Sequence, residues 1–265
     1  MKRFIPFMPQ EPVVSVVRMQ GVIASGGRGA SLNDAGLAPL IERAFARGKP
    51  KAVALVINSP GGSPTQSSLI AARIRRLAEE KNIPVYAFVE DVAASGGYWL
   101  ACAADEIWVD ENSVVGSIGV ISAGFGFQDL ISRYGIERRV HTSGETKSKL
   151  DPFKPEKPED VAWLKSLQAQ IHDSFIAHVK RRRGDRLTGE NLFNGDVWVG
   201  EKAIEQGLVD GVGHIVPKMK EIFGKRTRFA VYRQRRPLLS RFGAQMLEGA
   251  VGEFETRSAY ARFGL

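Results

Sequence analysis

The sequence predicts an α/β fold built on a mainly parallel β-sheet. Apolar runs of strand length alternate with segments that repeat apolar residues at helical spacing, which is typical of βαβ units. The run Ala52–Ile57 is apolar throughout, as expected for a strand that is buried on both faces. With 265 residues and 43% hydrophobic content, the chain is long enough for one sizeable domain.

The expected elements follow one another along this pattern. Strands are expected at 13–19, 52–57 and 84–89, shorter β segments at 106–109 and 114–122, and helices at 37–46, from Pro64, from Ser95 and at about 159–183. Ser63 fits an N-cap, with Pro64 at the first helical position and Gln66 completing a capping box. Parallel strands place their carboxyl ends at one sheet edge, where α/β proteins carry their sites.

Two of these helices show a clear apolar face. The helix after Pro64 repeats Ile70, Ile74 and Leu77 at helical spacing. The long helix carries an apolar stripe of Leu164, Leu167, Ile171, Phe175 and Val179. Both helices are therefore expected to pack on other parts of the fold.

The net charge of +8 is concentrated in two basic segments. Residues 225–241 contain seven basic residues and no acid, and Lys180–Arg183 form a second cluster. Such clusters can contact anionic lipid or nucleic acid, but most are solvated faces. No zinc-ligand spacing, RNA-binding aromatic motif or DNA-reading helix accompanies them, so we expect no nucleic-acid partner.

The single cysteine and the charge pattern bear on location. Cys102 lies in an apolar run and is expected to be a buried core residue. One cysteine forms no internal disulfide, which suits a reducing compartment. The start of the chain lacks the apolar stretch of a signal peptide, and no segment offers the roughly 20 apolar residues of a membrane span. We therefore expect a cytoplasmic protein without a transmembrane anchor.

A serine at the break between a strand and an Ala-rich helix is the first candidate for chemistry. Ser95 lies within Ala93–Trp99, just after an expected strand. A serine hydroxyl is a poor nucleophile until a neighbouring group takes its proton. Gly96 and Gly97 each cost about 1 kcal/mol of helix propensity, but they allow a peptide backbone to approach the serine. From these residues alone, a nucleophile and a simple N-cap are equally good interpretations.

A glycine turn ends the preceding strand. The segment Ser59–Gly62 is expected at the same sheet edge as Ser95. Its two glycines, Gly61 and Gly62, can direct N–H groups at a developing oxyanion, which is worth roughly 3–4 kcal/mol per donor. No Gly-Lys-Ser/Thr follows, so the turn is not a phosphate-binding P-loop, and an ordinary turn is the alternative.

The choice of catalytic base falls on a lysine. The four histidines, His141, His172, His178 and His214, lack neighbours that suggest catalysis, and we expect them to be structural or exposed. The segment Gly144–Lys149 supplies lysine instead. A lysine can act as a base when burial or a nearby cation lowers its pKa from about 10.4 towards 7–8.

Four short motifs occur together in this chain. They are Asn58–Gly62, Ala94–Tyr98, Gly116–Val120 and Gly144–Ser148, the last followed by Asp151–Phe153. Each motif is weak alone, but in combination they resemble the bacterial signal peptide peptidase A (protease IV) family. The resemblance covers about residues 13–223.

This resemblance implies roles for particular residues. In that family the serine of Ser-Gly-Gly-Tyr is the nucleophile and the lysine of Gly-x-x-Lys-Ser is the general base, which implies Ser95 and Lys147. The serine of Gly-Ser-Ile-Gly, here Ser117, holds the lysine amine. Gly61–Gly62 match the oxyanion segment, to which the backbone of Gly96 would contribute. No metal and no cofactor is implied.

The resemblance also implies a fold and an assembly. Family members are similar to Clp protease and crotonase, with a spiral of ββα units, and they form rings or domes. The active site would then be shared between neighbouring subunits of a homo-oligomer. Many members carry an amino-terminal membrane anchor and two tandem copies of the domain, whereas this sequence shows no anchor and one copy.

The end of the chain offers a possible membrane contact. An apolar stripe follows the basic stretch and consists of Leu239, Phe242, Met246, Ala250 and Phe254. This pattern is compatible with peripheral contact with an anionic membrane. Packing of a tail helix on its own ring is the simpler interpretation, and we favour it.

These observations combine into one prediction. We expect an N-terminal extension at 1–12, a single Ser/Lys peptidase domain at 13–223 and a basic tail with an amphipathic helix at 224–265. The predicted activity is that of a serine endopeptidase acting on remnant signal peptides or other hydrophobic or unfolded peptides. A crotonase-type acyl-CoA enzyme and a non-catalytic scaffold on the same fold are the alternatives, and a phage-type prohead protease is a variant of the peptidase.

Overall fold

The computed structural model describes residues 11–26, 31–144, 146–234 and 257–265. The chain divides into two units, Met1–Ile118 with Ile176–Leu265, and Gly119–Phe175. We describe each unit by itself. The apolar stripe from Leu239 to Phe254, a candidate for membrane contact, lies outside the described residues.

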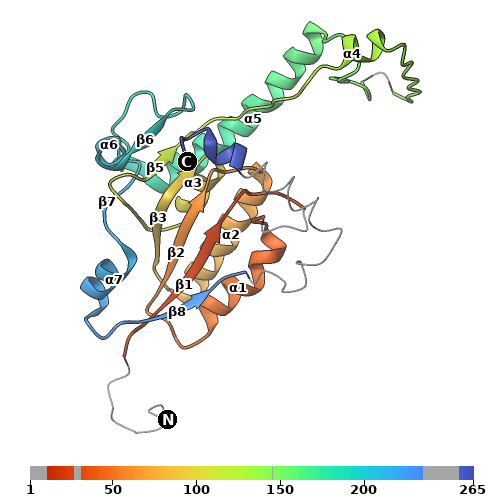
Figure 1. Ribbon diagram of the computed structural model, residues 1–265. Coiled ribbons are helices and arrows are strands. Elements are labelled where there is room, and N and C mark those ends of the chain that lie inside the picture. Colours follow the sequence, from red (N-terminus) through yellow and green to blue (C-terminus); the bar gives the residue numbers. More distant parts are fainter. Residues whose placement is uncertain (1–10, 27–30, 145, 235–256) are drawn as a thin grey trace. The chain divides into compact units, whose positions relative to one another are not determined.

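An eight-stranded sheet is the framework of the first unit (Figure 1). Its main path runs β6-β5-β3-β2-β1-β8, while β4 pairs with β3 and β7. The pairing of β5 with β6 is antiparallel and the others are parallel. The strands are β1 (Val13–Gln20), β2 (Ala52–Ser59), β3 (Val85–Ala94), β4 (Glu106–Val109), β5 (Val114–Gly116), β6 (Val197–Val199), β7 (Gly211–Val212) and β8 (Arg228–Tyr232). The α/β prediction with a mainly parallel sheet is confirmed.

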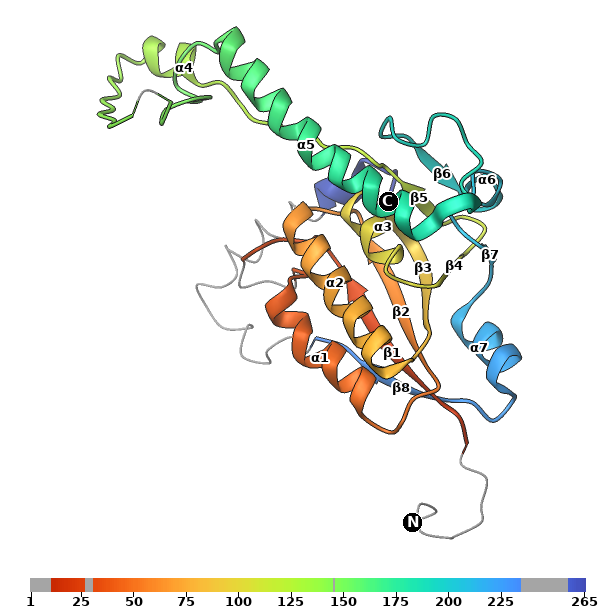
Figure 2. The ribbon, with the colours of Figure 1, turned by 180° about the vertical axis from the view of Figure 1, so that it is seen from behind.

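Helices cover the two faces of this sheet unequally. The helices are α1 (Asp34–Ala46), α2 (Pro64–Lys81), α3 (Gly96–Ala101), α4 (Gln128–Arg133), α5 (Pro158–Arg183), α6 (Gly200–Glu205) and α7 (Ile215–Phe223), with a short 3-10 helix at Gly184–Arg186. Seen from behind, α1, α2 and α3 lie together over one face (Figure 2). The opposite face carries α7, whose Met219 packs on the central strands.

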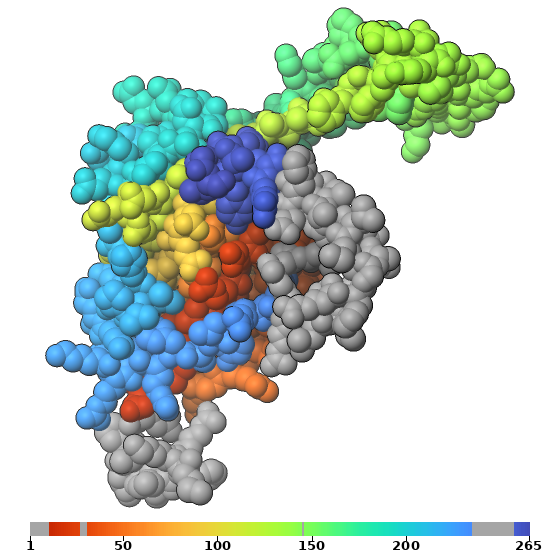
Figure 3. Space-filling view, viewed as in Figure 1, coloured from red at the N-terminus to blue at the C-terminus, as the bar shows by residue number. Residues whose placement is uncertain are grey.

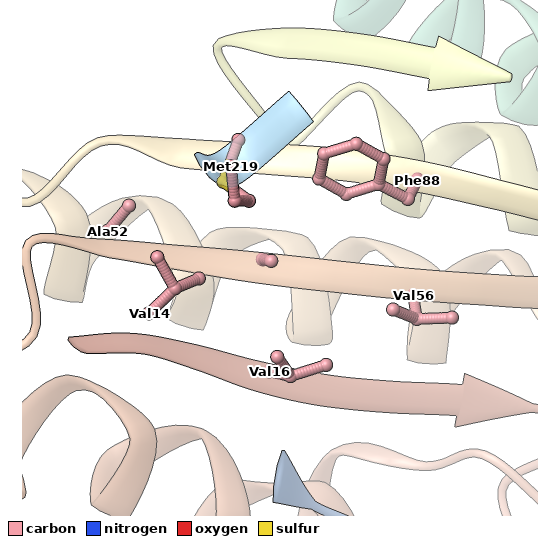
Figure 4. Packing of buried hydrophobic residues seen from close by; sticks show 7 residues of the cluster. Val14, Val16, Ala52, Val56, Phe88 and Met219 are labelled. Atoms are coloured by element: carbon pink, nitrogen blue, oxygen red, sulfur yellow. The ribbon is translucent and has the colours of Figure 1, made fainter. Parts of the chain in front are cut away.

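The central strands contribute to both faces of the core. All eight residues of β2 are buried, as expected for a strand between two neighbours with a layer on each side. Alternate residues point to the face that carries α7, where they form one cluster (Figure 4). Its buried members are Val14, Val16, Ala52, Ala54, Val56, Phe88 and Met219.

The start of α2 follows the sequence expectation in part. The Ser63 hydroxyl oxygen accepts a hydrogen bond from the Gln66 N–H at 3.4 Å, and Pro64 begins the helix. The Gln66 side chain does not complete a capping box, because its Oε1 accepts from the Asp34 N–H at 2.9 Å. Gln66 therefore ties the start of α2 to the start of α1, a long-range contact that local spacing does not reveal.

The basic cluster at the end of α5 is partly internal. Arg183 is buried, where it donates to the Gly207 carbonyl and to the Asp210 carboxylate. Arg182 donates to the Cys102 carbonyl at 2.8 Å. These arginines join α5 to the segments after α3 and α6, so the cluster is not simply a solvated face.

The second unit exposes most of its large apolar side chains. Ten are at least about one third exposed: Ile121, Phe125, Phe127, Leu130, Tyr134, Ile136, Val140, Trp163, Leu167 and Ile171. Its internal contacts include a hydrogen bond from the Phe127 N–H to the Pro152 carbonyl, the Phe127 and Phe153 rings at 5.6 Å, and an ion pair between Arg138 and Asp151. Among the described residues, little of the chain covers these large apolar side chains of the second unit.

Candidate active site

Ser95 lies at a sharp turn between β3 and α3. Its backbone has φ 51° and ψ −121°, and its N–H donates to the Gly116 carbonyl at 2.8 Å. A non-glycine residue with positive φ costs of order 1–3 kcal/mol and persists only where its surroundings enforce it. Here the parallel pairing of Ala94 with Gly116 holds the strand up to the serine. The turn leaves Ser95 partly accessible between buried neighbours.

The glycine turn after β2 packs directly against this serine. Gly61 has φ +102°, and a Cβ added there would lie 2.8 Å from the Ser95 Cβ and from the Gly96 nitrogen. A Cβ added at Gly96 would lie 2.4 Å from the Ser67 hydroxyl oxygen and 3.4 Å from the Gly62 nitrogen. At Gly61 the added Cβ would meet backbone atoms at a positive φ, so glycine is required there, whereas at Gly96 it would meet the Ser67 side chain.

Two N–H groups at this contact are free for a ligand. No hydrogen bond engages the N–H of Gly62 or of Gly96 within the described part of the chain. The Gly61 N–H instead donates to the Ser59 hydroxyl oxygen at 3.3 Å. Unengaged backbone donors beside a serine are what an oxyanion hole requires. Gly62 and Gly96 thus present unengaged N–H groups, whereas the Gly61 N–H is engaged within the turn.

Ser117 follows the neighbouring strand with the same unusual backbone. It has φ 51°, and its N–H donates to the Asp196 carbonyl at 2.7 Å. The preceding residue, Gly116, accepts the hydrogen bond from Ser95. The β segment expected to reach residue 122 therefore stops at Gly116, because the chain turns at Ser117 to place it beside the Ser95 strand.

The two candidate lysines lie in the second unit and differ in their surroundings. Lys147 is exposed, and its backbone N–H donates to the Gly144 carbonyl at 3.2 Å. The Lys149 ammonium lies 4.9 Å from the centre of the Trp163 ring, where it makes a cation–π contact. The structure thus brings Ser95, Ser117 and the glycine turn together within one unit. The pairing of Lys147 with Ser95 stays a prediction.

The histidines of the first unit have structural contacts. The His178 ring stacks on Trp99 at 4.8 Å, and its Nε2 hydrogen-bonds to the Trp99 carbonyl at 3.1 Å. Burial lowers the pKa of His178 to about 4, which keeps the ring neutral. His214 Nε2 lies 2.9 Å from the Asp110 carboxylate. The structural role expected for His178 agrees with these contacts.

Cys102 is buried as expected and chemically protected. Burial raises the pKa of its thiol to about 12, so it carries no thiolate near neutral pH. Within the described residues, no group of three or more His, Cys, Asp or Glu side chains is arranged to hold a metal ion.

Sequence reasoning missed polar contacts at the sheet edge. The Asn58 side-chain amide donates to the Asp91 carboxylate, joining the ends of β2 and β3. The Tyr260 hydroxyl donates to the Asn58 carbonyl at 2.7 Å. The polar Asn58 near the end of an apolar strand was a sequence signal for the contact with Asp91. No local pattern predicts the contact between Tyr260 and Asn58, which lie 202 positions apart.

Comparison with known proteins identifies the family. The profile of peptidase family S49 matches residues 77–222, more than half of the chain. The chain belongs to peptidase family S49. The matched range includes Ser95, Ser117 and Lys147, while Gly61 and Gly62 precede it.

Relatives of this S49 chain include proteins of several names. It is 44% identical over its whole length to a protein of Brucella melitensis biotype 1 named Na(+)/H(+) antiporter NhaA, of which it matches 39%. It is 32% identical over 62% of its length to the putative signal peptide peptidase SppA of Enterococcus faecium, of which it matches 48%. The chain therefore spans less than half of either relative.

A solved structure confirms the fold of the S49 chain. The membrane-bound stomatin-specific protease 1510-N, in a lysine-to-alanine variant in complex with a substrate peptide, superposes with a TM-score of 0.52. The match covers 92% of this chain and 99% of that one at 16% identity. The Clp protease-like fold class expected from the sequence is thus confirmed. In the described residues, no helix has both the length and the apolar content needed to cross a membrane.

Proposed function

We propose that this S49 chain is a serine endopeptidase in which Ser95 is the nucleophile and Lys147 the general base. The observation that carries the proposal is the backbone arrangement at Ser95. A serine with positive φ faces a glycine turn, and two unengaged N–H groups lie beside it. Family membership supports a peptidase over an acyl-CoA enzyme on a similar fold.

The proposed reaction follows acyl transfer to serine. The Ser95 hydroxyl oxygen attacks the scissile carbonyl while Lys147 takes the hydroxyl proton. The N–H groups of Gly62 and Gly96 donate to the oxyanion of the tetrahedral intermediate. Lys147 then protonates the leaving amine, which leaves an acyl-enzyme on Ser95. A water molecule next attacks the acyl carbonyl, with Lys147 again as the base, and the ester bond to Ser95 breaks. Ser117 orients the lysine amine by a hydrogen bond.

The base requires an environment that the single chain does not supply. A lysine accepts a proton near neutral pH only after it loses most of its contact with water. Lys147 is exposed within its unit, and the surrounding unit also exposes ten large apolar side chains. A second copy of the chain docked on these side chains would bury them and desolvate the lysine. We therefore infer a homo-oligomer whose active sites are shared between neighbouring subunits.

The inferred substrates are peptides in extended form. A backbone-lined site between strand ends suits an unfolded segment rather than a folded surface. The relative named putative signal peptide peptidase supports remnant signal peptides as substrates, and the substrate peptide in the similar solved structure supports peptides as the class. We infer action from the cytoplasmic side, with peripheral rather than spanning membrane contact, which fractionation of cells at low and high salt would test.

Covalent labelling of the serine tests the proposed function. Purified full-length chain is treated with a fluorophosphonate probe, alongside Ser95→Ala, Lys147→Ala and the matched control Lys149→Ala. We expect labelling of the wild type and the control, and loss in the first two variants. A folded, oligomeric wild type that takes no label would refute the peptidase and favour a non-catalytic scaffold. Full labelling of Lys147→Ala would move the base to another residue.

A further inference from the structure

The C-terminal residues lie over the strand ends that carry the candidate site. Tyr260 and Phe263 pack against one apolar cluster of the sheet. Its buried members are Val92, Ala94 and Val114. The space-filling view shows residues 257–265, in dark blue, lying over this end of the unit (Figure 3). Since Ala94 immediately precedes Ser95, the two rings pack on the strand residue next to the proposed nucleophile.

Tyr260 adds a polar contact on the neighbouring strands. Its hydroxyl donates to the Asn58 carbonyl at 2.7 Å, and the same carbonyl accepts from the Gly21 N–H at 3.0 Å. Burial, only partly offset by the Gly21 N–H, raises the pKa of Tyr260 to about 12. The hydroxyl therefore stays protonated and remains a donor near neutral pH. The Asn58 carbonyl therefore connects Tyr260 with the ends of β1 and β2.

Asn58 and Gly21 each come shortly before a segment that forms or contacts the glycine turn at Gly61–Gly62. Gly61 lies three positions after Asn58, and Ile23 lies two positions after Gly21. The Ile23 N–H donates to the Gly61 carbonyl at 2.8 Å, and its carbonyl accepts from the Ser63 N–H at 2.8 Å. The Gly62 N–H is thus held between two segments that both start at the Asn58 carbonyl, which accepts from the Gly21 N–H and from the Tyr260 hydroxyl.

We propose that Tyr260 and Phe263 are positioning residues for the peptidase reaction. They fix the ends of the strands beneath Ser95 and beside Gly62, so that the hydroxyl and the oxyanion donors keep their relative geometry. This inference rests on the proposed function above. It makes the C-terminal segment a required part of the site rather than an appendage that blocks it.

The test separates rate from binding and from stability. In full-length protein, Tyr260→Phe removes one hydroxyl, and we expect kcat for peptide hydrolysis and the fluorophosphonate labelling rate to fall about five- to tenfold, as for one lost hydrogen bond. KM should stay within about twofold, because a group that acts only on transition-state geometry leaves substrate binding unchanged. Phe263→Ala should lower kcat by a similar factor, and Phe263→Leu should restore most of it.

A matched control uses the same chemical change elsewhere. Tyr86 lies near the start of β3, at the end of the sheet remote from Ser95, and Tyr86→Phe should leave the labelling rate unchanged. Wild-type rates in folded Tyr260→Phe and Phe263→Ala would overturn the positioning role. Faster hydrolysis or a lowered KM in these variants would also overturn it, because the segment would then obstruct the substrate path. An unlabelled, inactive wild type would refute the proposed function itself and this inference with it.

Discussion

The proposed nucleophile Ser95 and the proposed base Lys147 lie in two regions of contrasting packing. Around Ser95, backbone segments approach so closely that glycine is required at Gly61 and Gly62. Around Lys147, the second unit leaves ten large apolar side chains exposed, and glycines such as Gly126 have open space around them. The region around Ser95 is closely packed by residues of the same chain. The second unit presents an apolar surface that a partner would bury.

This contrast indicates where control of the reaction lies. An oxyanion hole made of packed backbone is available as soon as the first unit folds. A lysine base becomes effective only when water leaves it. If the chain assembles as proposed, assembly would change the surroundings of Lys147 and leave the backbone around Ser95 as it is. The predictions below test each part of that proposal.

The largest effect is expected at the glycine turn. In Gly62→Ala the new Cβ would lie 2.0 Å from the Ile23 carbonyl oxygen at a φ of +137°. The turn must move, and we expect labelling of Ser95 to fall by about 10²–10³-fold, as for a lost oxyanion donor. Gly126→Ala, where nothing lies within 4 Å, is the matched change in the second unit and should be silent in the isolated chain. Normal labelling of Gly62→Ala would contradict the packed turn.

The next effect concerns the exposed apolar surface. Phe125 is 80% exposed, so Phe125→Asp should leave the thermal stability of the isolated chain unchanged. If a second copy covers this surface, the buried charge should shift the protein to monomers and lower labelling at least about tenfold. Sedimentation velocity and probe labelling on the same sample check both outcomes. Unchanged assembly would place the contact between subunits elsewhere.

A smaller effect should appear in the acid stability of the first unit. The His178 pKa of about 4 in the folded chain lies below its ordinary 6.5, so the unfolded chain binds more protons between these values. The stabilisation from neutral His178 is complete above about pH 6.5 and is lost as pH falls towards 4, by up to about 3 kcal/mol. Urea unfolding at pH 7 and pH 4.5 measures it. The difference in the free energy of unfolding between the two pH values should shrink in His178→Gln and persist in His214→Gln.

The smallest effect is expected for the second lysine. The ammonium of Lys149 is engaged over the Trp163 ring, so Lys149→Gln should change the labelling rate by less than about threefold. Probe labelling that is quenched at fixed times across pH 6–9 measures the labelling rate and the pH at which that rate is half-maximal. A midpoint that moves in Lys149→Gln, and stays fixed in a Lys147 variant, would exchange the roles of the two residues.

Much of the first unit was predictable because its signals are local. The apolar run in β2, the glycine turn after it and the Ser63 cap of α2 each follow from neighbouring residues. The grouping of Ser95 with Gly61–Gly62 follows from one rule, that parallel strands end at a common edge. The family resemblance then assigned chemical roles that spacing alone left open between a nucleophile and a cap.

The remainder depended on contacts between distant segments. Gln66 pairs with Asp34 rather than with Ser63, and Arg183 is buried against Asp210, because tertiary partners outcompete the local alternatives. The contact from Tyr260 to Asn58 spans most of the chain. No pattern in the sequence reports which strand end a late segment will reach, so these parts of the site emerge only from the fold.

The hydrogen bond from Ser117 to Asp196 carries a consequence for synthesis of the protein on the ribosome. Ser95 leaves the ribosome about a hundred residues before the strand β6 that pairs with β5 and holds Ser117. In a growing chain the backbone around Ser95 and Ser117 therefore becomes complete only after Asp196 and β6 have been synthesised.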